Sequence, residues 1–101
     1  IGVDLNQDAI YPGHILTSMV KRVDRGSYLI VESVVKNTFK GGQVFTMNVA
    51  NGGVGLTDMS VMKKALGSKF PQDILTKIQQ LTEDIKAGKI KVDTYPGFKR
   101  D

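Results

Sequence analysis

The sequence predicts an α/β fold in which short strands alternate with helices. Residues 1–4 are mostly apolar and run into a polar loop, as the end of a buried strand does, and residues 44–49 form a second strand-like run. Two longer segments, beginning near residues 24 and 71, carry apolar residues at three- and four-residue steps. This order favours a layered α/β arrangement, and crossovers of this length usually join parallel strands.

The first quarter of the chain contains one clear turn and one ambiguous segment. Residues 5–8 are polar and predict a loop, and Tyr11-Pro12-Gly13 predicts a turn because proline presets one dihedral and glycine permits the next. Residues 15–20 are short, apolar and partly β-branched. They fit a buried strand or the first turns of a helix, and periodicity does not distinguish the two.

A helix is predicted from Asp24 onward, on an apolar stripe of Tyr28, Val31, Val34 or Val35, and Thr38. Asp24 suits the positive end of the helix dipole, and Lys36 suits the negative end. Gly26 weakens this helix by up to about 1 kcal/mol relative to alanine, or else allows close packing.

Glycines delimit the middle of the chain. Gly41 and Gly42 close the preceding element, residues 44–49 then predict a strand, and residues 52–56 predict a glycine-rich connection. Three glycines within four positions suggest positive φ angles or a close approach of another backbone. The segment lacks both the Walker A ending and the full GxGxxG spacing, so it is no phosphate-binding loop.

The clearest helix is predicted to start at Pro71, with Asp73 in its first turn and an apolar stripe of Ile74, Ile78, Leu81 and Ile85. Gly88 is placed as its stop signal. Residues 90–92 could extend briefly, and residues 95–97 turn the chain into a basic tail.

Composition and charge narrow the function classes. Fourteen Lys and Arg against ten Asp and Glu give a net charge of +4, but acids punctuate the basic groups at residues 21–25, 63–64 and 99–100. A diffuse solvated surface is therefore favoured over a nucleic-acid patch, which stays as a rival. With no cysteine and one histidine, these residues form no disulfide, thiolate site or multi-histidine metal site.

Asp4 and Lys21 are the candidate binding residues, because each lies where a strand is predicted to end. Ligands of open α/β sheets bind outside the carboxyl ends of the strands. On position alone, a loop-capping aspartate and a solvated lysine are favoured over these binding roles. Asp8 lies deeper in the loop and suggests a structural role, and His14 suggests a turn or surface residue because no GxSxG elbow accompanies it. The four methionines suggest core filler or surface residues and not a cofactor site.

Residues 1–7 and 12–24 together closely resemble the basic membrane protein lipoproteins, the family of purine-nucleoside receptors. The matching runs read IGVDLNQ and PGHILTSMVKRVD. They are followed in order by NTFKGG at residues 37–42, GGVGL at residues 52–56 and GKIKV at residues 88–92. The resemblance covers nearly the whole chain, and Asn6 departs from it where the family commonly has an acid.

The resemblance implies a substrate-binding lipoprotein of an ABC importer, with the two-lobed fold of type I periplasmic binding proteins. It implies that Asp4 and Lys21 contact the ribose of a purine nucleoside, with no cofactor, no metal and no catalysis. The expected partners are the transporter permease and an N-terminal lobe of the same protein. The expected location is extracytoplasmic, with a lipid anchor upstream.

On this resemblance, the chain is expected to be a C-terminal fragment. Residues 1–50 would supply strands and a helix of the second lobe, and residues 51–101 a hinge-crossing segment and the terminal helix. A flavin or another ribityl or ribosyl ligand is the alternative within the fold.

Overall fold

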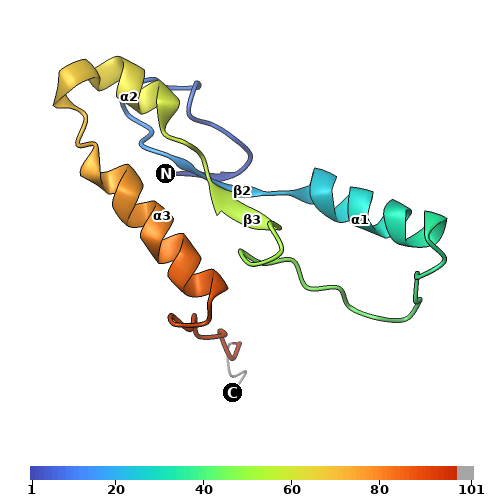
Figure 1. The fold of residues 1–101 in the computed structure, drawn as a ribbon. Helices are drawn as coiled ribbons and strands as arrows, with labels where there is room; N and C mark the ends of the chain where they lie inside the picture. Colours follow the sequence, from blue (N-terminus) through green and yellow to red (C-terminus); the bar gives the residue numbers. More distant parts are fainter. Residues whose placement is uncertain (98–101) are drawn as a thin grey trace.

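The structure is a computed structural model that describes residues 1–97, in which a small three-stranded sheet joins three α-helices (Figure 1). The strands are β1 (Gly2–Asp4), β2 (Ser18–Lys21) and β3 (Val54–Leu56). The helices are α1 (Val23–Val35), α2 (Ser60–Leu66) and α3 (Asp73–Lys86), with a short 3₁₀ turn at Gly67–Lys69 after α2. The basic tail predicted at Lys99 and Arg100 lies outside the described residues.

The sheet has the order β1-β2-β3, with β1 parallel to β2 and β3 antiparallel to it. The predicted α/β class with parallel strands is confirmed by β1 and β2, although the crossover that contains α1 joins β2 to an antiparallel strand and not to a parallel one. The ambiguous segment at residues 15–20 enters a strand at Ser18. The loop of residues 5–17 that joins the parallel strands contains no helix. Asp4 lies opposite Val20, and Lys21 lies opposite Val54. This register brings the ends of β1 and β2 together.

Two predictions for the middle of the chain are wrong. Residues 44–49 form no strand, and the third strand instead falls at residues 54–56, within the segment predicted as a connection. The reason is pairing, since residues 54–56 meet β2 and Thr57 extends the ladder by donating its backbone N–H to the Ser18 carbonyl at 3.0 Å. Helix α2 was not predicted, and the brief extension after α3 forms no strand.

The two predicted helices are confirmed with small shifts at their ends. Helix α1 starts one residue before Asp24 and ends at Val35, where Asn37 (φ 54) takes the left-handed position that often follows a helix. Helix α3 starts at Asp73, two residues after Pro71. It ends with Gly88 at φ 74, the predicted stop signal.

The buried core is small and lies where α2 meets α3. Met59, Met62 and Phe70 form it, at 1%, 6% and 4% exposure, with Leu16, Ile74, Leu75 and Ile78 packed around them. Two of the four methionines are thus core filler as predicted.

Helix α1 projects away from α2 and α3 (Figure 1), and none of its side chains is buried among residues 1–97. The accessible surface is 8338 Å² and the radius of gyration 17.2 Å. A compact protein of 11.0 kDa exposes about 5,600 Å² and has a radius near 13 Å. Much of the surface that a protein of this size would bury therefore lies open.

Candidate functional site

Asp4 and Lys21 form an ion pair at the adjacent ends of the parallel strands β1 and β2. The Lys21 Nζ lies 2.8 Å from the Asp4 Oδ1, and the two side chains are 58% and 57% exposed to solvent. The pair combines an acceptor of several hydrogen bonds with a donor of up to three. It matches the chemistry of vicinal hydroxyl groups, which both donate and accept. Both sequence candidates thus lie in one place.

The backbone at Asp4 adopts an uncommon conformation. Its φ is 72°, and the backbone N–H of Leu5 donates to the Val3 carbonyl at 2.9 Å, which closes a three-residue turn around Asp4. Aspartate tolerates positive φ better than most residues, yet the conformation still has an energetic cost. The turn ends β1 abruptly and leaves the Asp4 carboxylate at the strand end.

A buried polar network holds the loop that follows Asp4. The Ser18 hydroxyl accepts the backbone N–H of Gln7 at 3.0 Å and donates to the Asp8 carboxylate. Ser18 and Asp8 are 0% and 2% exposed, and the Gln7 side chain accepts the Val3 N–H. Gly2 belongs to the same network, because a Cβ there would collide with the Ser18 hydroxyl. The structural role predicted for Asp8 agrees with these contacts.

On the other side, Lys21 is flanked by β3 and by the loop that precedes it. Arg22 donates its backbone N–H to the Gly53 carbonyl at 2.8 Å, directly after Lys21 leaves the sheet. Lys21, Gly26, Met47 and Gly53 are among the residues that line a cavity of about 440 Å³ there. The position of Lys21 therefore depends on how the loop of residues 46–53 packs against the start of α1.

The other charged candidates pair with neighbours. The Arg22 guanidinium donates to Asp24 at 2.7 to 3.2 Å, and this hydrogen bonding lowers the pKa of the Asp24 carboxyl to about 2. The pKa of Asp58 is also lowered, because its carboxylate accepts the backbone N–H of Ser60 at the start of α2. Further pairs join Lys36 to Glu32, Lys86 to Glu83 and Lys89 to Asp84. Positive and negative groups are thus interspersed, as the composition suggested.

His14 lies in the turn predicted for it. Its ring is 4.2 Å from that of Tyr11, and its Nδ1 lies 3.4 Å from the Pro12 carbonyl oxygen. Over residues 1–97, no cluster of three or more His, Cys, Asp or Glu side chains is arranged to hold a metal ion. Likewise, none of the helices described there is long and apolar enough to cross a membrane.

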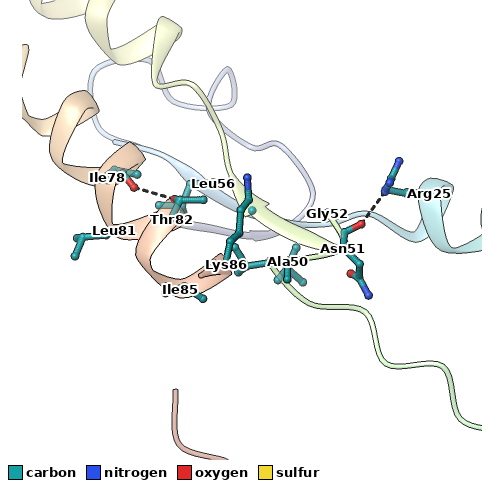
Figure 2. Close-up of a pocket in the computed structure, with 13 residues that line it drawn as sticks. Arg25, Ala50, Asn51, Gly52, Leu56, Ile78, Leu81, Thr82, Ile85 and Lys86 are labelled. Atoms are coloured by element: carbon teal, nitrogen blue, oxygen red, sulfur yellow. Dashed lines mark hydrogen bonds between the residues drawn. The ribbon is translucent and has the colours of Figure 1, made fainter. Parts of the chain in front are cut away.

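A broader cavity of about 620 Å³ opens between α3 and the chain leading into β3 (Figure 2). Its helical wall is largely apolar, with Ile78, Leu81 and Ile85, and Arg25 lies at the opposite side beside Asn51. Neither Asp4 nor Lys21 lines it. The hydrogen bond between Arg25 and Asn51 is a feature that sequence reasoning missed, since it joins residues 26 positions apart.

Comparison with known families gives a match over residues 1–92, to the family described as ABC transporter substrate-binding protein PnrA-like. An uncharacterized lipoprotein of Pyrococcus furiosus is 31% identical over 119 residues, covering 93% of this chain and 30% of the relative. Basic membrane protein B of Borrelia garinii subsp. bavariensis is 35% identical over 60 residues, covering 57% of this chain and 18% of the relative.

Among solved structures, the chain is similar to a solute-binding protein of an ABC transporter system from Aeropyrum pernix. The TM-score is 0.70 at 23% identity, over 95% of this chain and 33% of that one. At this identity the likeness shows the fold. The chain thus spans a third or less of the length of these relatives.

Proposed function

Because this chain belongs to the family of PnrA-like substrate-binding proteins of ABC transporters, we propose that it is the C-terminal part of a receptor for purine nucleosides. The complete protein would have two lobes, with the ligand held between them and then delivered to a permease. Residues 1–50 would belong to the second lobe, and residues 51–101 would supply a hinge-crossing segment and the terminal helix. Binding would shift a hinge equilibrium toward the closed form without chemical change to the ligand.

The observation that carries this proposal is the ion pair between Asp4 and Lys21. Its carboxylate and ammonium lie 2.8 Å apart at neighbouring strand ends and are more than half exposed, so a ligand can reach both. The Asp4 carboxylate would accept hydrogen bonds from the 2′- and 3′-hydroxyls of ribose, and Lys21 would donate to one of their oxygens. The ion pair holds both groups in place before the ligand arrives.

The large open surface supports the two-lobed arrangement. Helix α1 buries none of its apolar stripe among the described residues, and the matched relatives are about three times as long as this chain or longer. We take the remainder of the polypeptide to be the partner that covers this surface. The relatives named lipoproteins and basic membrane proteins support an extracytoplasmic protein anchored to the membrane by lipid.

Calorimetric titration of the complete polypeptide with inosine, guanosine and adenosine tests the proposal. Charged hydrogen bonds contribute about 1.5 to 3 kcal/mol each and Asp4 would accept two of them, so Asp4→Ala should weaken binding by about a hundredfold or more. Glu83→Ala is the matched control, because Glu83 belongs to an ion pair of similar length, 2.9 Å, on α3, and its side chain is also more than half exposed. Absence of binding by the wild type, or unchanged binding by Asp4→Ala, would contradict the proposal.

A flavin or another ribityl compound remains a second candidate ligand, because its hydroxyls would suit the same pair. Mass spectrometry of the ligand that copurifies with the native protein distinguishes the two. A purine nucleoside supports the first proposal, and a flavin supports the second.

A further inference from the structure

Arg25 links two segments that lie next to Lys21, the first turn of α1 and the loop before β3. Its Nε donates to the backbone carbonyl of Asn51 at 2.9 Å, which ties the first turn of α1 to the loop before β3 (Figure 2). Arg25 lies in the first turn of α1, four residues after Lys21. The bond therefore spans two parts of the chain that are adjacent to the candidate binding residue.

The loop that Arg25 holds is itself well defined. The Asn51 side chain accepts the backbone N–H of Asn48 at 2.8 Å and donates to the Thr46 carbonyl at 2.9 Å. Gly53 donates its backbone N–H to the Asn48 carbonyl at 2.8 Å. With these bonds, residues 46–53 form one hydrogen-bonded bend, so a contact at Asn51 acts on the position of the whole bend.

Two glycines allow close contacts of the bend. Gly52 has a φ of 75°, and a Cβ built there would lie 3.1 Å from the Arg25 Nε. Gly53 is buried, and a Cβ there would lie 2.9 Å from the Cα of Met47, which belongs to the bend itself. These positions admit no side chain without movement of the contact partners. Gly52 thus permits the contact between the bend and α1, and Gly53 permits the close packing within the bend.

The bend in turn fixes the exit of β2. The Gly53 carbonyl accepts the backbone N–H of Arg22 at 2.8 Å, and Val54, the next residue, lies opposite Lys21 in the sheet. Lys21 has a long side chain, and its ammonium is located by its backbone and by the ion pair with Asp4. A shift of the bend would move that backbone relative to Asp4, whose own turn is held by the Ser18 network.

We propose that Arg25 is a positioning residue for ligand binding, which through Asn51 and Gly53 holds Lys21 in register with Asp4. This rests on the proposed function, because it assigns Arg25 an effect on recognition of the ribose hydroxyls. Arg25 touches no ligand in this scheme. It acts on how well the protein distinguishes a ligand with vicinal hydroxyls from one without them.

The test compares inosine with 2′,3′-dideoxyinosine, which lacks both hydroxyls. In the complete wild-type polypeptide, inosine should bind more tightly, and Arg25→Ala should reduce the ratio of the two dissociation constants by about tenfold, the loss of one well-placed hydrogen bond. Lys89→Ala is the matched control: it likewise removes one positive charge, and the side chain lost contacts Asp84 near the end of α3. It should leave the ratio unchanged.

Gly52→Ala gives a second route to the same contact, because the added methyl group would push against the Arg25 side chain. Gly52→Ala should lower the ratio of the two dissociation constants as Arg25→Ala does. A thermal melt of each variant establishes that the variant is folded. A wild type without preference for inosine would refute the hydroxyl-binding function itself. A wild type that discriminates, together with an Arg25→Ala or Gly52→Ala variant that is folded and discriminates equally well, would overturn the positioning role alone.

Discussion

Replacement of Ser18 by alanine should be among the most destabilising single changes near the candidate site. The Ser18 hydroxyl is fully buried, accepts the Gln7 N–H at 3.0 Å and donates to the Asp8 carboxylate, which is 2% exposed. Alanine removes both bonds. The part-buried N–H of Gln7 and the buried carboxylate of Asp8 then lack the Ser18 hydroxyl as a partner.

The size of the effect follows from those two groups. A buried polar group that loses its partner costs about 1 to 3 kcal/mol, with charged groups at the upper end, so one neutral donor and one carboxylate together give about 4 kcal/mol. Urea unfolding followed by far-ultraviolet circular dichroism measures it. Ser33→Ala is the matched control, because its hydroxyl donates to the Ile30 carbonyl on the exposed part of α1, and its loss should cost less than about 1 kcal/mol.

A double-mutant cycle separates the interaction energy between Ser18 and Asp8 from the general cost of shortening either side chain. Asp8→Ala combined with Ser18→Ala should cost less than the sum of the single changes, by about 1 kcal/mol or more, because each single change leaves a group that the double change removes. The reasoning is refuted if Ser18→Ala costs no more than Ser33→Ala, or if the two costs simply add.

Two other predictions concern the core and the first turn of α1. Phe70→Ala should cost about 3 kcal/mol, because Phe70 is 4% exposed in a core of few residues, whereas Leu81→Ala, at 44% exposure, should cost much less in the same unfolding assay. The Asp24 carboxyl should titrate near pH 2 by nuclear magnetic resonance, and Arg22→Ala should return it toward its usual value of 3.8. Since the folded pKa is the lower one, the stabilising contribution of Asp24 is present above pH 3.8 and is lost as the pH falls toward 2. An Asp24 midpoint that does not respond to Arg22→Ala would contradict this pairing.

The elements that the sequence predicts well are those specified by local pattern. Helix α3 combines an early proline, an acid in its first turn, a regular apolar stripe and Gly88 beyond its end, and all of these signals lie within the helix or beside it. By contrast, the third strand is specified by a partner. Residues 44–49 have the better β composition, yet the register with β2 selects Val54–Leu56, and a run of three residues carries no periodicity of its own.

The candidate site divides in the same way. The proximity of Asp4 and Lys21 follows from two predicted strand ends once the strands are parallel, because Asp4 pairs with Val20 and Lys21 is the next residue. The contact between Arg25 and Asn51 depends on a loop whose shape comes from side-chain to backbone bonds and positive φ angles. In the sequence, Gly52 and Gly53 were the one indication of this contact. They suggested that another part of the chain approaches closely, but not which part.

Helix α1 shows why correct local predictions do not fix what a segment packs against. Its apolar stripe is the one expected from the sequence, but Tyr28, Val31 and Val35 are 64%, 63% and 76% exposed. Burying an apolar side chain of this kind contributes about 1.5 to 3 kcal/mol, so a covering surface would stabilise the helix strongly. The sheet end that carries Asp4 and Lys21 leads straight into this helix, with Arg22 alone between β2 and α1. In the two-lobed arrangement proposed for the complete protein, whatever covers α1 would also steady the exit of β2, and the positions of Asp4 and Lys21 would depend on contacts on both sides of Lys21.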